Sequence, residues 1–324
     1  MRQQPHTPFP PLPVDTGPER RCGVEIEFSG LTEDAAADLV ARTLGGNVTE
    51  CGHRAYEIRD TSLGTMKVEL DTALRKASAR PLIEMGLDLA RRVVPVELIT
   101  PPLTSAQMPV LDGLRTALRD AGAQGSRDGL FFGFGVHLNP EVPELPTHTA
   151  RIILAYALLE DWLHMANPVD PTRRFLPFVS PWPHSLIDAL VAEPDSSPDA
   201  LFAIYADHTQ TRNHGLDLMP LFRHLDPGRF EVVVPNASAI SARPAFHYRL
   251  PDCRIDESDW SLDVPWQAWM QVERLALDKD LLFSLCDDWQ AFRYATGVLG
   301  GQSRRQWAHH VDARLISDGW KSAA

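Results

Sequence analysis

The chain has 324 residues, of which 44% are hydrophobic and 23% are charged, and its formal net charge is −12. This length and apolar content are enough to bury one large core or two modest ones, as in an ordinary globular protein. The negative charge argues against general affinity for nucleic acids or anionic membranes, and it favours a small molecule or a protein as the partner.

Cysteine usage and hydropathy favour the reducing cytoplasm. The four cysteines show no CxxC spacing, so neither a zinc knuckle nor a redox pair is indicated; they are Cys22, Cys51, Cys253 and Cys286. No apolar run reaches transmembrane length. The pair Arg20-Arg21 precedes an acidic strand pattern rather than an apolar stretch, so it does not begin a secretion signal.

The first half of the chain mixes helix and strand patterns. Residues 1–20 are rich in proline and lack a periodic apolar face, which predicts a disordered or surface-laid tail. Apolar periodicity then predicts helices over 32–44, 81–92, 105–121 and 147–166, and strands over 22–28, 47–51, 54–59, 66–71, 94–100 and 130–138.

The second half changes character after the long helix over 147–166. Residues 167–227 contain many prolines and irregular polar stretches, which predicts a lid or specificity region with only short helices. Strands are expected over 229–234 and 245–250, and an almost wholly helical stretch over 264–319. We therefore expect one main domain over 21–285, with a C-terminal helical extension over 286–324 packed on it.

The segment Cys22-Gly-Val-Glu-Ile-Glu-Phe28 is the most informative stretch of the sequence. As a strand, it places Glu25 and Glu27 on the face opposite its apolar residues. Two carboxylates roughly 7 Å apart on one face repel each other, and their burial is costly unless cations lie between them. The pair is thus a candidate metal site, although a solvent-facing acidic edge explains the same pattern.

The same alternation gives several later strands a polar face. The residues on that face are Lys67, Glu69, Asp71, Glu97, Gly133, Gly135, His137, Asn139, His247 and Arg249. Strands that are apolar on one side and polar on the other predict an α+β fold in which helices back one face of the sheet and a wet cavity lies on the other. The two glycines leave room for a ligand or a backbone segment, or mark a bulge.

This combination of residues suits divalent cations and phosphate. Carboxylates with an imidazole favour Mg²⁺ or Mn²⁺. Arg212, Arg243 and Arg249 are candidate phosphate clamps, because guanidinium groups match phosphate geometry, although each of them taken alone could equally be a surface or ion-pair residue. The sequence contains neither GxxxxGK[ST] nor GxGxxG, so we expect any nucleotide to be held through metals and arginines.

An ordered set of motifs resembles the amidoligase family, which is similar to glutamate–cysteine ligase and glutamine synthetase. The resemblance covers roughly residues 21–285. The motifs are Gly23-Val-Glu-Ile-Glu-Phe28, Glu97-Leu-Ile-Thr-Pro-Pro-Leu103, Gly135-Val-His-Leu-Asn139, Arg212-Asn-His-Gly-Leu-Asp-Leu218 and Arg243-Pro-Ala-Phe-His-Tyr-Arg249.

The resemblance implies a mostly antiparallel sheet curved into a funnel, as in the glutamine synthetase-like catalytic fold, two or more Mg²⁺ ions, and ATP. It assigns Glu25, Glu27, Glu97 and His137 to the metals and Arg249 to the ATP phosphates. We add Arg243 and Asn139 as cofactor-binding candidates, and Arg212 and Arg243 join Arg249 as catalytic candidates. Relatives commonly carry an acid where this chain has His247, so the metal there is expected to be more weakly or differently held, and Glu69 and Asp71 are candidates to supply the missing charge.

The function expected from this resemblance is ATP-dependent joining of a carboxylate to an amine through an acyl phosphate. The substrates would be small molecules such as amino acids, polyamines or peptides. Arg173, Arg174 and Arg212 could clamp either a substrate carboxylate or ATP. Two alternatives stay open: a degenerate metal- and ligand-binding protein of the same fold, and a metal-dependent hydrolase. A homo-oligomeric state is also open.

Overall fold

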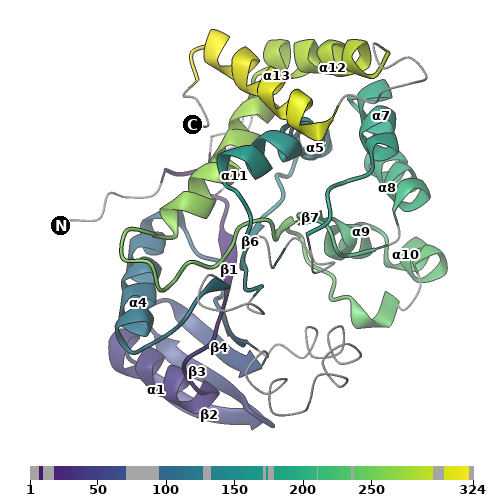
Figure 1. Cartoon of the computed structure of the whole chain (residues 1–324). Helices are drawn as coiled ribbons and strands as arrows, with labels where there is room; N and C mark the ends of the chain where they lie inside the picture. Colours follow the sequence, from purple (N-terminus) through teal and green to yellow (C-terminus); the bar gives the residue numbers. More distant parts are fainter. Residues whose placement is uncertain are drawn as a thin grey trace, which may run out of the picture.

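The chain folds around one open antiparallel sheet of eight strands (Figure 1). The computed structural model describes residues 7–9, 18–70, 95–126, 133–170, 173, 179–209, 211–234, 237–294 and 303–320. The predicted helix over 81–92, Asp71, Arg174 and most of the tail over 1–20 lie outside these ranges. Within them the chain contains ten α-helices, which confirms the predicted α+β class.

The acidic strand β1 lies inside the sheet, between β5 and β6. The strand order is β2-β3-β4-β5-β1-β6-β8-β7, and every neighbouring pair is antiparallel. The strands are β1 (Cys22–Phe28), β2 (Asn47–Gly52), β3 (Ala55–Thr61), β4 (Gly64–Leu70), β5 (Val96–Ile99), β6 (Val136–Pro140), β7 (Leu216–Asp217) and β8 (His247–Tyr248).

Most of the predicted helices are present, with small shifts of their ends. The helices are α1 (Glu33–Leu44), α4 (Met108–Asp120), α5 (Pro146–Ala166), α7 (His184–Ala192), α8 (Pro198–His208), α9 (Met219–Leu225), α10 (Pro227–Val233), α11 (Asp263–Leu277), α12 (Lys279–Tyr294) and α13 (Arg304–Ser317). Among the described helices, none combines the length and the apolar character that a membrane crossing needs.

The strand predicted over 229–234 is wrong, because this segment forms helix α10. Asp226 caps the helix by accepting a hydrogen bond from the backbone N–H of Arg229, and Pro227 occupies the first turn. Both features favour a helix start over a strand. The irregular region over 167–227 also contributes more than loops, since its residues Leu216–Asp217 form β7 at one edge of the sheet.

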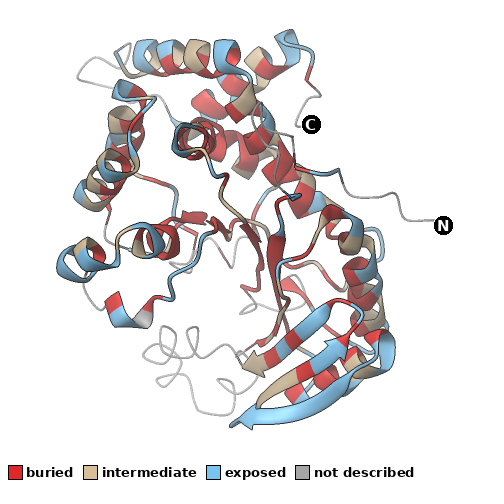
Figure 2. Cartoon of the chain, turned by 180° about the vertical axis from the view of Figure 1, so that it is seen from behind, coloured by how far each residue is buried: buried red, intermediate tan, exposed pale blue. Residues whose placement is uncertain are grey.

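Helices cover the apolar side of the sheet. Helix α1 packs on β2, β3 and β4, and α11 packs on β6. The ring of Trp269 in α11 lies 5.4 Å from that of Phe246 and 5.3 Å from that of Tyr248, measured between centroids. Figure 2 shows that β1 is buried along its whole length, whereas the edge strand β2 is exposed. The helices thus bury the strands that carry the polar residues.

We expect Trp269→Ala to destabilise the fold by roughly 3–5 kcal/mol, because it removes the aromatic side chain that supports β8 and leaves a cavity. Val264→Ala, on the exposed side of the same helix, is the control and should change stability by less than about 0.5 kcal/mol. Urea denaturation measures both free energies of unfolding. Equal values for the two variants would contradict the described packing of α11 on β8.

Candidate functional site

Strand register brings the predicted metal residues onto one face of the sheet. Glu27 lies opposite Glu97 in β5, and Glu97 lies opposite Glu69 in β4. On the other side of β1, Glu25 lies opposite His137 in β6. Directly opposed residues of antiparallel strands share a face, so these five side chains belong to a single polar surface, as the alternation predicts.

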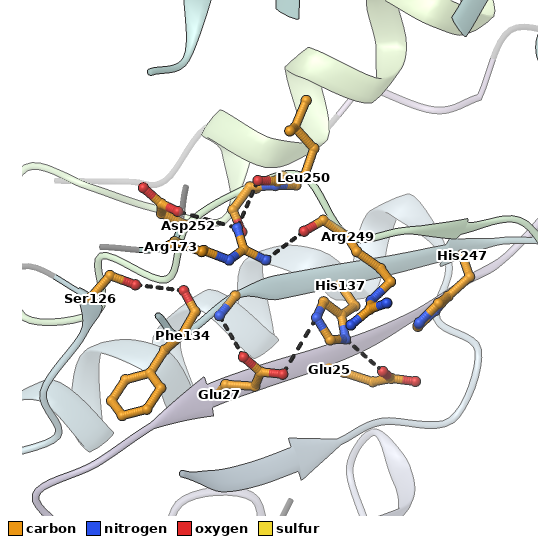
Figure 3. A network of polar contacts seen from close by, with 12 residues as sticks. Glu25, Glu27, Ser126, Phe134, His137, Arg173, His247, Arg249, Leu250 and Asp252 are labelled. Atoms are coloured by element: carbon orange, nitrogen blue, oxygen red, sulfur yellow. Dashed lines mark hydrogen bonds and ion pairs between the residues drawn. The ribbon is translucent and has the colours of Figure 1, made fainter. Parts of the chain in front are cut away.

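Among the described residues, two groups of possible metal ligands form on this face, and His137 belongs to both. One group contains Glu25, His137 and His247, and the other contains Glu27, Glu97 and His137. Within each group the ligand atoms lie within 4.8 Å of one another. Glu69 is in neither group, although it is opposite Glu97 in the sheet. Figure 3 shows His137 between Glu25 and Glu27.

His137 contacts both carboxylates of β1. Its Nδ1 lies 2.9 Å from Glu25 Oε2, and its Nε2 lies 3.4 Å from Glu27 Oε1. Because an ionised carboxylate only accepts, Nδ1 carries a proton that it donates to Glu25. A lone pair on Nε2 would then face the Glu27 oxygen, which is unfavourable unless a second proton or a cation lies between them.

The separation of Nε2 and the Glu27 oxygen suits a cation. Two adjacent ligands of an octahedral Mg²⁺ each bind at about 2.1 Å, which places them about 3 Å apart. The observed 3.4 Å is close to that separation. With the Glu97 carboxylate beside them, the donors are one imidazole and two carboxylates, which is a ligand set that Mg²⁺ or Mn²⁺ accepts.

The carboxylate of Glu25 is ionised although it is buried. Burial raises its pKa, but the hydrogen bond from His137 and the positive charge of Arg243 outweigh that effect, and its pKa lies well below the usual value. Arg243 donates from its NH1 group to Glu25 Oε1 at 2.8 Å. The negative charge of Glu25 is therefore compensated by protein groups.

Asn139 connects Glu25 to His247. Its Nδ2 donates to Glu25 Oε1 at 3.1 Å, and its Oδ1 lies 2.7 Å from His247 Nδ1. Burial lowers the pKa of His247 well below its usual value, so the ring is neutral at pH 7. The described contacts of Asn139 thus join two predicted metal residues, and its predicted role in cofactor binding stays a prediction.

Two of the three predicted arginines are held by acids, and the third contacts the backbone of another. Arg243 and Arg212 are each held at one end by an acid, Glu25 and Asp217 respectively, and their side chains are 45% and 39% exposed. Arg249 donates from NH1 to the carbonyl oxygen of Arg212 at 2.7 Å. Within the described part of the chain, its buried Nε has no hydrogen-bond partner. A buried donor of this kind requires an acceptor, such as water or a ligand.

Sequence reasoning did not assign a role to Asp217. It is fully buried in β7, lies opposite His247, and accepts hydrogen bonds from Arg212 Nε at 2.8 Å and from the backbone N–H of Met219 at 3.0 Å. The signal was present, because Asp217 lies within the motif that begins at Arg212. Asp217 fixes the orientation of Arg212.

Arg173 occupies the space that the sequence suggested for a ligand. A side chain at Gly135 would place its Cβ 2.4 Å from Arg173 NH2, so the glycine makes room for this guanidinium group. Arg173 is buried and donates to the carbonyl oxygens of Arg249, Leu250 and Pro251. Its described contacts anchor the backbone after β8, and its contact with a substrate or ATP stays a prediction.

Comparison with known proteins identifies the family. A family model described as "putative amidoligase enzyme" matches residues 18–271, which is most of the chain. The match contains all eight strands and all of the predicted site residues. No curated protein matches the chain significantly.

The ligand group on β1 and β5 gives a prediction about metal binding. We expect Glu27→Gln and Glu97→Gln each to weaken Mn²⁺ binding at least about tenfold, because each change removes a charged oxygen ligand. Calorimetry in the presence of a non-hydrolysable ATP analogue measures the affinity. Glu50→Gln, on the exposed edge strand β2, is the matched control. If both site variants bound Mn²⁺ as tightly as the control, this group would not be a metal site.

Proposed function

The chain belongs to the amidoligase family, and from this premise we propose that it is an ATP-dependent ligase that joins a carboxylate to an amine. The observation that carries the proposal is the buried group of Glu27, Glu97 and His137, with Arg249 beside it in Figure 3 and Arg243 bound to the neighbouring Glu25. A cation site next to phosphate-binding groups is what phosphoryl transfer requires.

The residues present fit a divalent cation. Glu27, Glu97 and His137 would hold one Mg²⁺ or Mn²⁺. In the group of Glu25, His137 and His247, His137 Nδ1 donates to Glu25, so only Glu25 and His247 would remain for a second cation. When bound, the cations would neutralise negative charge on the ATP phosphates during transfer. The 3.4 Å separation between His137 Nε2 and Glu27 Oε1, which a cation could bridge, supports the first of these assignments.

Arginines would bind the phosphates. Arg249 has a buried Nε without a partner, so an anionic oxygen in this position would satisfy a donor that the described residues leave open. Arg212 and Arg243 each use one guanidinium nitrogen to contact an acid, and their side chains are half-exposed. Their remaining N–H groups could therefore face a ligand. Guanidinium groups suit this role because they bind phosphate oxygens in pairs.

The proposed reaction has two steps. In the first, an oxygen of the substrate carboxylate attacks the γ-phosphorus of ATP, the bond from that phosphorus to the bridging oxygen breaks, and ADP leaves. In the second, the amine nitrogen attacks the acyl carbon, the bond from that carbon to the phosphate oxygen breaks, and inorganic phosphate and a proton are released. The residues of the sheet mainly position the reactants and stabilise the charge of the transferred group.

We extend the proposal to the shape of the site and to the substrates. The polar face of the antiparallel sheet would form the wall of a funnel, as in the glutamine synthetase-like fold. Its entrance would admit a small carboxylate and a small amine, such as amino acids, polyamines or peptides. The helices packed on the apolar face support this arrangement, because the polar residues then lie on the opposite face of the sheet.

Incubation with Mg²⁺-ATP and pools of amino acids, polyamines and peptides tests the proposal. We expect ADP release that depends on a substrate pair, together with a product whose mass is the sum of the two substrates less one water. Glu27→Gln is the inactive control. Binding of metal and nucleotide without ADP release would favour a degenerate binding protein. Substrate cleavage with a gain of water and without ATP would favour a metal-dependent hydrolase.

Arg249→Lys tests the phosphate role separately. Lysine keeps the charge but loses the planar fork, so ATP turnover should fall by more than about tenfold, which corresponds to roughly 1.4 kcal/mol of transition-state stabilisation. The melting temperature should change little, because the neighbouring Tyr248 still fills the core. A much lower melting temperature with normal turnover by the folded fraction would instead assign Arg249 to the scaffold.

A further inference from the structure

Glu25 accepts three hydrogen bonds from protein groups. Asn139 Nδ2 and Arg243 NH1 both donate to Oε1, and His137 Nδ1 donates to Oε2. An ionised carboxylate has about four acceptor sites, so these donors use most of the capacity of Glu25. Glu27 differs, because Oε2 accepts from the backbone N–H of Gly135 at 2.6 Å while Oε1 faces His137 Nε2. The two acids of β1 therefore have different surroundings.

The contacts of Glu25 also determine the orientation of Asn139. Because the carboxylate only accepts, the amide group of Asn139 must direct its Nδ2 toward Glu25. Its carbonyl Oδ1 then faces His247 Nδ1 at 2.7 Å, and Oδ1 only accepts. His247 Nδ1 therefore carries a proton that it donates to Asn139, which leaves Nε2 for another contact.

We infer that Glu25 and Asn139 are positioning residues that hold His137 and His247 with a proton on Nδ1, so that both rings offer Nε2 to a cation. Glu25 acts on His137 directly and on His247 through Asn139. Carboxylates and amides that hydrogen-bond a histidine in this way fix its tautomer and ring orientation. The inference rests on the proposed metal-dependent function. It assigns different roles to the two acids: Glu27 binds the cation, and Glu25 positions the histidines.

Nuclear magnetic resonance of the metal-free protein with ¹⁵N-labelled histidine tests this inference. Long-range proton–nitrogen correlations report which ring nitrogen carries the proton, and His137→Gln and His247→Gln assign the two sets of signals. We expect Nδ1 to be protonated in both rings of the unsubstituted protein, and Nε2 of His247 to be unprotonated. A proton on His247 Nε2 in place of Nδ1 would overturn the inference.

Glu25→Gln should invert the tautomer of His137. Asn139 and Arg243 both donate to Oε1, so the glutamine would keep its oxygen toward them and direct its NH₂ group toward His137. Nδ1 would then accept a hydrogen bond, and the ring proton would move to Nε2, where it blocks the cation. We expect this inversion together with a loss of Mn²⁺ affinity of at least about tenfold. An unchanged His137 tautomer would overturn the role of Glu25.

Asn139→Ala should release His247 without removing a charge. We expect the His247 signals to move toward those of the exposed His53, and the Mn²⁺ affinity to fall about tenfold. Asn47→Ala, on the exposed strand β2, is the matched control and should change neither. An unchanged His247 tautomer, or a changed tautomer with unchanged Mn²⁺ affinity, would overturn the role of Asn139. The tautomers are measured without ATP, so failure of the ligase assay would leave this result standing.

Discussion

Burial of two acids on one strand is the constraint on which the rest of the site depends. Glu25 and Glu27 are almost completely buried in the middle of the sheet. Two uncompensated carboxylates in that position would cost several kcal/mol. His137 between them and Arg243 supply the compensation for Glu25, whereas Glu27 Oε1 faces the second nitrogen of His137. This imbalance marks the position at which we propose a cation.

The scaffold explains why the acids are buried in the first place. β1 has a strand on each side and is buried on both faces, and aromatic side chains of α11 support the neighbouring strand β8. β8 carries His247 and leads directly to Arg249. The same packing that stabilises the core therefore also positions a candidate metal ligand and a candidate phosphate-binding residue. Arg173 strengthens this arrangement by holding the carbonyl oxygens that follow β8. Stability and site geometry thus share the same contacts.

Strand alternation was sufficient to predict which residues share the polar face. A period of two is a strict property of strands, so Glu25, Glu27, His137 and His247 could be placed together without any knowledge of the fold. The contacts within that face were not predictable, since Arg243 and Glu25 are 218 positions apart in the chain. For the same reason, the sequence could not show that Arg173 fills the space beside Gly135. Local capping by Asp226 decided the conformation of α10, and apolar residues alone had suggested a strand there.

The most direct test of the account is the position of a bound metal. Crystals grown with Mn²⁺ and a non-hydrolysable ATP analogue would locate the ion by its anomalous scattering. We expect a peak about 2.2 Å from His137 Nε2 and from carboxylate oxygens of Glu27 and Glu97, with the analogue phosphates on the same side of the sheet. Fully bound nucleotide with no Mn²⁺ at these three side chains would contradict it.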